Sequence, residues 1–189
     1  VIEFFNSIGY AVISMDLRGH GHSQGKRGHI DTYKQLMDDV DLLVKKAQEL
    51  FNDLPLIMYG HSLGGNIAAN YVLRRQPAFK GLIVTAPYFK LAFDPPKWKV
   101  FLSAVMAKIL PALTLPTGLE LAALSRDQAV VDAYKNDPLV HDKISSAFFN
   151  NVHAAASYPI EHAEELKIKT LAMHGLMDRI TSYKGTTAF

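Results

Sequence analysis

The residues with the clearest chemical potential lie in Tyr59-Gly-His-Ser-Leu-Gly-Gly65, directly after the apolar run 55–58. A serine flanked by glycines two residues before and two residues after it, between a strand and a helix, is typical of a sharp turn that exposes a nucleophilic hydroxyl. We therefore predict that Ser62 is a nucleophile for acyl transfer. The backbone N–H of Leu63, at the start of the following helix, is predicted to stabilise the oxyanion that this attack creates.

The alternative interpretation is a purely structural turn, because the Gly-x-Ser-x-Gly pattern also occurs by chance. Its place between a strand and a helix, and the additional glycine at position 65, favour the catalytic interpretation. The glycines at 60, 64 and 65 are expected to give strand and helix room to pass close together.

A serine hydroxyl is a poor nucleophile near neutral pH and needs an imidazole base, which a carboxylate in turn orients. In folds that carry a nucleophilic serine in such a strand-to-helix turn, the chain order is serine, acid, histidine. The acid is therefore expected after a later strand. Asp178 follows the apolar run 168–173 and a glycine turn, and it is the predicted acid. The competing interpretation of Asp178 is a helix N-cap, a place that Thr181 or Ser182 could also fill.

No histidine follows Asp178. The eight histidines all precede it, at positions 20, 22, 29, 61, 141, 153, 162 and 174. His61 is adjacent to Ser62, and alternating side-chain directions make it a poor base. His174 is predicted to pack at the end of a strand. We therefore expect the catalytic histidine in a segment beyond Phe189.

A metal site is the other chemistry that the histidines suggest. His20, His22 and His29, with Asp16, form a cluster in the sequence, but no ligand spacing supports a bound metal. We predict neither a metal nor a cofactor. Asp16 and Arg18 are instead expected to brace the glycine-rich loop of residues 16–28.

The elements that must position these groups alternate between helices and strands. Helical spacing of apolar residues and short β-favouring runs identify them, and the long second helix has Asp31 or Thr32 as its predicted N-cap. The predicted helices cover 1–8, 33–51 and 67–75, and the predicted strands cover 10–15, 56–59, 81–85 and 168–173. This alternation implies a parallel sheet with helices on both faces, and hence an α/β fold.

The alternation of helix and strand patterns stops between residues 88 and 155. Prolines punctuate helical pieces there, and no strand pattern is visible before residue 168. We predict a helical cap over 88–155, inserted between two parts of the core, 1–87 and 156–189. The cap contains an apolar stretch, 98–115, most of which is expected to pack on the sheet.

The composition excludes several classes of function. The 189 residues, 49% of them hydrophobic, suffice for one domain with a substantial core. The 20 basic and 18 acidic residues are scattered, so no nucleic-acid interface is predicted. The absence of cysteine excludes disulfides and thiolate chemistry and is compatible with a reducing compartment, so the cytoplasm is the predicted location. Polar residues interrupt the stretch 98–115, so no transmembrane segment is predicted.

Several longer motifs resemble the monoglyceride lipase and lysophospholipase branch of the α/β-hydrolases, often grouped with the serine aminopeptidase-like hydrolases. They are Gly9-Tyr10 leading into DLRGHGHS (16–23), GHSLGG (60–65), LSRD (124–127), NDPLVH (136–141) and HGLMDRIT (174–181). The motifs follow the order of the family and cover essentially the whole chain. Those in the cap are not demanded by the general fold, which makes the resemblance specific.

The resemblance implies an α/β-hydrolase fold with Ser62 as nucleophile, the Leu63 N–H as one oxyanion donor and Asp178 as the triad acid. The first strands of the family, with a His-Gly loop that supplies the second donor, are expected before Val1, and the histidine after Phe189. The core is therefore expected to be incomplete, and the 189 residues alone are expected to be incompetent for full catalysis.

For function, the resemblance implies a cofactor-independent carboxylic-ester hydrolase acting on a lipid-like small molecule such as a monoacylglycerol or lysophospholipid through an acyl-enzyme. Part of the stretch 98–115 would then line an acyl-chain pocket or make peripheral contact with a membrane. Two alternatives remain open. The same triad serves peptidases and small-ester hydrolases, because a fold does not fix the substrate. The missing histidine also fits a non-catalytic binding module of the same fold.

Overall fold

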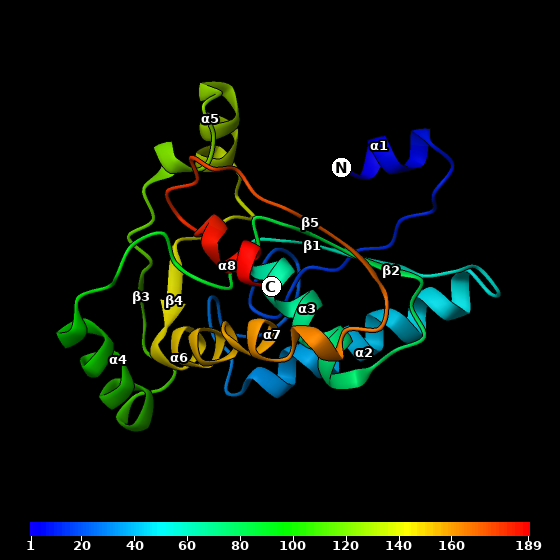
Figure 1. The fold of residues 1–189 in the computed structure, drawn as a ribbon. Coiled ribbons are helices and arrows are strands. Elements are labelled where there is room, and N and C mark those ends of the chain that lie inside the picture. The colour runs from blue at the N-terminus through cyan, green and yellow to red at the C-terminus, as the bar shows by residue number, and fades with distance from the viewer.

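The computed structural model describes residues 1–189 and has a three-stranded parallel sheet at its centre (Figure 1). The strands β1 (Ile57–His61), β2 (Gly81–Thr85) and β5 (Lys169–Met173) follow the order β1-β2-β5. Their register is regular, so His61 pairs with Thr85, and Thr85 with Met173. All three strands therefore end at the same edge of the sheet.

Helices α2, α3, α6 and α7 gather below the strands in the view of Figure 1, whereas α1 and α5 lie above them. The helices are α1 (Ile2–Ser7), α2 (Tyr33–Leu50), α3 (Leu63–Arg75), α4 (Lys97–Ile109), α5 (Gln128–Asn136), α6 (Ser146–Ala155), α7 (Tyr158–Glu161) and α8 (Tyr183–Ala188). Short 3-10 turns cover Leu121–Ala123 and Ala163–Glu165. On the less covered face of the sheet, the ring of Phe5 from α1 lies edge-on to Tyr59, 6.0 Å between centroids.

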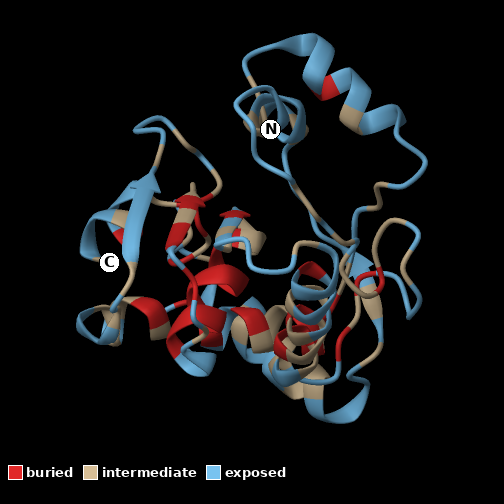
Figure 2. Ribbon diagram, turned by 90° about the vertical axis from the view of Figure 1, so that its right-hand side faces the viewer, coloured by how far each residue is buried: buried red, intermediate tan, exposed pale blue.

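The core lies where the helices pack against the sheet, and Figure 2 shows the buried residues concentrated there. Helix α3 is central to it, because every residue from Gly65 to Leu73 is buried. Helix α2 contributes a single stripe with helical spacing, formed by Leu36, Met37, Val40 and Ala47. From the sheet, Leu82 and Val84 complete this layer. Phe148 and Val152 of α6 belong to the same cluster, so the fold depends mainly on burial between α2, α3, α6 and β2.

Most predicted elements are confirmed, with shifted ends around the serine. The strands at 81–85 and 168–173 and the long helix with its N-cap at Thr32 are present. Strand β1 continues through Gly60 and His61, because both keep their pairing with β2. Helix α3 begins at Leu63, four residues before its predicted start, because Asn66 N already donates to Ser62 O at 3.1 Å.

The strand predicted at 10–15 is wrong. The segment forms no ladder, and its only backbone–backbone hydrogen bond runs from Tyr10 N to Phe5 O at 3.0 Å. A strand needs a neighbouring backbone that supplies donors and acceptors, and no other strand pairs with this segment. Its β-favouring side chains alone are therefore insufficient.

The prediction that residues 88–168 contain no strand is also wrong. Strands β3 (Thr114–Pro116) and β4 (Lys143–Ser145) pair in antiparallel fashion, with Leu115 opposite Ile144. Three residues are too few to show a recognisable alternation of apolar and polar side chains, which is why the sequence pattern did not reveal them.

Gly28 joins the glycine-rich loop to β4 by a close backbone approach. Its φ of +67° is left-handed, and a Cβ at this position would overlap the carbonyl of Lys143. The Gly28 carbonyl accepts from Ser145 N at 2.8 Å, and His29 Nδ1 lies 2.8 Å from Ser145 Oγ. A residue larger than glycine would therefore separate the loop from β4.

We expect Gly28→Ala to lower the free energy of unfolding more than Gly118→Ala. Both glycines have φ +67°, so both substitutions introduce the same backbone strain, but nothing lies within 4 Å of a Cβ at Gly118. The overlap with Lys143 should cost roughly 1–3 kcal/mol in addition. Urea denaturation of the two variants measures this difference. Equal losses would contradict the close approach.

Candidate functional site

Ser62 lies at the junction of β1 and α3 in a strained backbone conformation. Its φ of 53° and ψ of −117° fall in a region that residues with a side chain rarely adopt. Three backbone hydrogen bonds hold the turn. Ser62 N donates to Thr85 O at 3.0 Å, and Ser62 O accepts from Asn66 N at 3.1 Å and from Tyr88 N at 2.9 Å. The side chain is half-buried and makes no capping hydrogen bond to α3, which leaves Oγ available.

The three glycines around Ser62 differ in how much space a side chain would have at each position. A Cβ at Gly60 would overlap the backbone of Gly64, and one at Gly65 would lie 2.8 Å from Pro87 Cβ. These two glycines allow the close approach that the sequence predicted. Gly64 is different, because no atom lies within 4 Å of its Cβ position, so packing in this structure does not explain it.

Leu63 is the first residue of α3, so its N–H has no acceptor within the helix. It follows Ser62 directly and carries the partial positive charge of a helix N-terminus. This position suits the predicted oxyanion role.

Asp178 lies in the loop between β5 and α8, and its carboxylate is held by the loop itself. Oδ1 accepts from Ile180 N at 2.8 Å and from Thr181 N at 2.9 Å, and Oδ2 lies 3.1 Å from Thr181 Oγ1. The N-cap of α8 is Ser182, so the interpretation of Asp178 as a helix N-cap is wrong. Burial raises the pKa of Asp178, but the hydrogen bonds from Thr181 and Ile180 outweigh it, and the net pKa lies below its usual value. The group is therefore ionised at neutral pH.

Contacts at the sheet edge connect the loop of Asp178 to the turn of Ser62. Ala86, which follows β2, donates its N–H to Met173 O at 2.8 Å. Thr181 Oγ1 lies 3.2 Å from Ala86 O as well as beside the Asp178 carboxylate. Since Ser62 is bonded to the end of β2 at Thr85, the two predicted site residues belong to one edge.

No imidazole is hydrogen-bonded to Ser62 Oγ. The ring of His61 bonds instead to Thr85 Oγ1 at 2.9 Å. His174 approaches the acid, with Nε2 3.5 Å from Asp178 Oδ2. However, its Nδ1 lies 2.6 Å from Thr186 Oγ1, its Nε2 lies 3.1 Å from Thr181 O, and its side chain is 3% exposed. Both ring nitrogens are occupied, which fits the predicted packing role.

The histidines in and next to the glycine-rich loop have separate partners. His20 stacks on His141 at 4.7 Å between ring centroids, and His29 contacts Ser145 and Asp31. No group of three or more histidine, aspartate or glutamate side chains is placed to hold a metal ion.

Asp16 and Arg18 brace this loop, as predicted. Asp16 Oδ2 accepts from His22 N at 2.8 Å, and Asp16 O accepts from Ser23 Oγ at 2.6 Å. The guanidinium of Arg18 makes two hydrogen bonds to Asp39 of α2, one of them 2.6 Å long from Nε to Oδ2. The loop is thereby fixed against α2.

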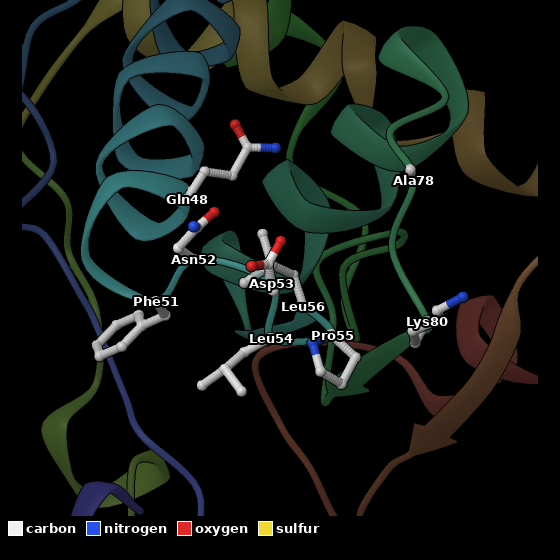
Figure 3. Close-up of a pocket in the computed structure, with 9 residues that line it drawn as sticks. All are labelled: Gln48, Phe51, Asn52, Asp53, Leu54, Pro55, Leu56, Ala78 and Lys80. Atoms are coloured by element: carbon white, nitrogen blue, oxygen red, sulfur yellow. The ribbon is translucent and has the colours of Figure 1, made fainter.

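The hollow shown in Figure 3 lies at the opposite end of the sheet. It has a volume of about 660 Å³ and is lined by the end of α2, the loop 51–56, Ala78 and Lys80. Leu56 and Lys80 directly precede β1 and β2, so the hollow opens at the amino ends of these strands. A second hollow, of about 710 Å³, lies between the glycine-rich loop and α2. Neither is lined by Ser62 or Asp178, and neither is the candidate site.

Helix α4 lies at the periphery of the molecule. The expectation that most of the apolar stretch 98–115 packs on the sheet is therefore wrong. None of its residues is buried, and Trp98, Phe101 and Ile109 are 64%, 71% and 67% exposed. The helix lies against α6, where Asn150 Nδ2 donates to Ser103 Oγ at 2.8 Å, and so it is kept away from the sheet (Figure 1). No helix combines the length and apolar character needed to cross a bilayer.

Sequence reasoning missed two residues that surround the nucleophile turn. Asn66 is fully buried, and its side chain contacts Tyr88 and Tyr33. A signal for Asn66 was present, because an amide in an otherwise apolar helix, one turn after Ser62, requires hydrogen-bond partners. Tyr88 gave no signal, since its part in the turn is played by the backbone.

Comparison with known proteins places the chain in a family. All of residues 1–189 match the family described as serine aminopeptidase, S33. The chain is 31% identical to phospholipase YtpA of Bacillus subtilis, covering 95% of this chain and 70% of the relative. It is 30% identical to a monoacylglycerol lipase of Mycolicibacterium smegmatis, covering 98% of this chain and 66% of the relative.

A solved structure agrees with these relatives. The crystal structure of Paleococcus ferrophilus monoacylglycerol lipase superimposes with a TM-score of 0.90 at 32% identity, over 99% of this chain and 70% of that one. The chain spans only part of its relatives, down to 20% of an abhydrolase domain-containing protein of Dictyostelium discoideum, to which it is 33% identical. The match over the whole chain shows that it belongs to the serine aminopeptidase S33 family of α/β-hydrolases.

Proposed function

We propose that the protein is a serine hydrolase that cleaves carboxylic esters of lipid-like substrates such as monoacylglycerols or lysophospholipids. One observation carries the proposal: Ser62 sits in a strained turn with its Oγ free, at the sheet edge to which Asp178 also belongs. The substrate class is supported by relatives named monoacylglycerol lipase and phospholipase.

In this mechanism Ser62 Oγ attacks the ester carbonyl and its proton passes to an imidazole. The negative charge on the carbonyl oxygen is stabilised by the Leu63 N–H. The C–O bond to the alcohol then breaks, and the alcohol leaves with the proton from the imidazolium. Water, deprotonated by the same imidazole, attacks the acyl-enzyme and releases the acid and Ser62.

Asp178 orients the imidazole and stabilises its charged form. Its low pKa supports this role, because the carboxylate is ionised when the imidazolium forms. We assign the base to a histidine outside residues 1–189, because none of the eight histidines is hydrogen-bonded to Ser62 Oγ and the chain covers 66% of a monoacylglycerol lipase relative. Nucleophile, base, acid and oxyanion donors are all protein groups, so the reaction needs no cofactor.

We further propose that residues 88–155 form the cap and that α4 is its contact with a lipid surface. Trp98, Phe101 and Leu102 are exposed on this helix, and Lys97 and Lys99 lie beside them. Exposed aromatic and aliphatic side chains next to lysines suit the boundary between acyl chains and headgroups. Contact of this kind would bring the site close to membrane-borne esters.

A peptidase of the same fold is the second candidate, favoured by the family description as serine aminopeptidases. The two activities differ in the acyl group that they accept. A preference of the full-length protein for long-chain monoacylglycerols over aminoacyl amides supports the esterase, and the reverse order supports the peptidase.

We expect Ser62→Ala to abolish covalent labelling of the full-length protein by a fluorophosphonate and to lower kcat for a monoacylglycerol by roughly 10³-fold or more. The labelled peptide is identified by mass spectrometry. Ser7→Ala, which changes an exposed serine on α1, serves as the control and should label normally. Equal labelling of wild type and Ser62→Ala would reject both the nucleophile and the hydrolase. An unlabelled wild type would favour the non-catalytic binding module.

We expect Asp178→Asn to lower kcat by roughly 10³- to 10⁴-fold, because an amide stabilises the wrong imidazole tautomer. Since the pKa of Asp178 lies below its usual value, the carboxylate of the wild type is ionised from roughly pH 6 to 9. The loss should therefore be present throughout that range in kcat profiles. A variant with wild-type kcat would remove Asp178 from the triad.

We expect the double substitution Trp98→Ser with Phe101→Ser to weaken binding of the full-length protein to vesicles of phosphatidylcholine and phosphatidylglycerol by roughly tenfold. Leu42→Ser is the matched control, because Leu42 is 67% exposed and lies on α2, outside residues 88–155. Co-sedimentation measures the binding. Hydrolysis of a short, dissolved ester should be unchanged in all variants. If the control weakens binding equally, α4 is not the contact surface.

A further inference from the structure

We propose that Asn66 and Tyr33 are positioning residues that fix the backbone of the Ser62 turn through Tyr88, an inference that rests on the proposed function of Ser62. Neither side chain is adjacent to Ser62 Oγ in the hydrogen-bond network. Their effect passes through the backbone of Tyr88 and ends at the carbonyl of Ser62.

Asn66 reaches the Ser62 carbonyl by two routes. Its backbone N–H donates directly to Ser62 O at 3.1 Å. Its side-chain Nδ2 donates to Tyr88 O at 2.9 Å, and Tyr88 N donates to the same Ser62 O at 2.9 Å. The residue is 0% exposed, so water does not compete for these bonds. One buried residue therefore supplies one of the two donors that meet at the Ser62 carbonyl and holds the other in place.

The Ser62 turn needs these hydrogen bonds because the backbone is strained on both sides of the bond from Tyr88 N to Ser62 O. Ser62 has a φ of 53°, and Ala86, two residues before Tyr88, has a φ of 42°. Conformations of this kind persist only where surrounding interactions impose them. Residues 86–88 lie beyond the end of β2, so the sheet ladder does not hold Tyr88 in place. The Asn66 side chain supplies that constraint.

Tyr33 determines which way the Asn66 amide faces. Its hydroxyl donates to Asn66 Oδ1 at 2.7 Å, which directs Nδ2 towards Tyr88. Burial raises the pKa of Tyr33, so the hydroxyl remains protonated and keeps donating. Tyr33 is itself anchored at the start of α2, where its N–H donates to Asn151 Oδ1 of α6 at 3.1 Å. The pair, on α3 and α2, is thereby tied to one further helix, α6.

Asn70 shows what an equally buried asparagine does when it has only a structural role. It is 0% exposed and lies one turn further along α3. Its Nδ2 donates to Ala155 O at 3.0 Å and to the backbone carbonyl of Asn66 at 3.0 Å, and its Oδ1 accepts from Arg74 Nε at 2.9 Å. The bond to Ala155 connects α3 to α6, the other two lie within α3, and none of the three involves Tyr88. Asn70 is therefore a matched control for Asn66.

The test compares Asn66→Leu with Asn70→Leu in the full-length protein. We expect Asn66→Leu to lower the rate of Ser62 labelling by a fluorophosphonate, and kcat, by about 10- to 100-fold, because small displacements of a reacting group have effects of this size. KM should stay within about twofold, since the substitution removes no predicted substrate contact. Asn70→Leu should reduce thermal stability while it labels at nearly the wild-type rate.

Two milder variants keep the proposal testable if Asn66→Leu does not fold. Tyr33→Phe removes only the hydroxyl and should slow labelling by roughly three- to tenfold. In Asn66→Asp, the introduced carboxyl can donate to Tyr88 O only when it is protonated. The labelling rate of this variant, divided by that of the wild type at each pH, should therefore fall as the pH rises. If the Asn66 side chain only fills space, this ratio of labelling rates should be the same at every pH.

The outcomes distinguish a failure of the proposed function from a failure of the positioning role. A wild type that is not labelled at Ser62 removes the proposed function, and the positioning role with it. A labelled wild type together with normal rates in folded Asn66→Leu overturns the positioning role alone. The positioning role is likewise overturned if Asn70→Leu slows labelling as much as Asn66→Leu, or if the Asn66→Asp ratio does not change with pH.

Discussion

The alignment of strand ends at one edge of the sheet is the constraint on which the rest of the structure depends. Because β1, β2 and β5 are parallel and in register, the chain leaves all three strands at the same level. Ser62, Ala86 and the loop of Asp178 start from that level. Their separation along the sequence is large, but hydrogen-bonded backbones make them neighbours. Without the shared register, no local motif could bring a hydroxyl and a carboxylate to one place.

The conformation of Ser62 is maintained by groups that do no chemistry. Its unfavourable backbone angles are compensated by hydrogen bonds from Asn66 and Tyr88 and to Thr85. Asn66, in turn, belongs to the most buried helix of the molecule. The same core that stabilises the fold therefore also imposes the strain at the site. Rigid surroundings are what allow a high-energy turn to remain populated.

The sequence predicted the local structure at the candidate site better than its surroundings. The turn at Gly60 and Ser62, and the place of Asp178 after β5, could be predicted because sharp turns and chain order leave short-range signals. The strand expected at 10–15 failed because strand formation depends on a partner backbone, which side-chain pattern does not report. The exposure of Trp98 and Phe101 depends on where α6 holds α4, a tertiary fact. Tyr88 was missed because it acts through its N–H and C=O, which every residue possesses.

Gly28 has a consequence for the independence of the region 88–155. Gly28 and the adjacent His29 attach the loop of residues 16–28 to β4, and Arg18 attaches it to α2. The region 88–155 thus packs through β4 against a loop that lies more than a hundred residues earlier in the chain. Evolution or engineering cannot exchange it as a self-contained cassette. A chimaera that transplants it must also inherit the loop, or the two surfaces will no longer match.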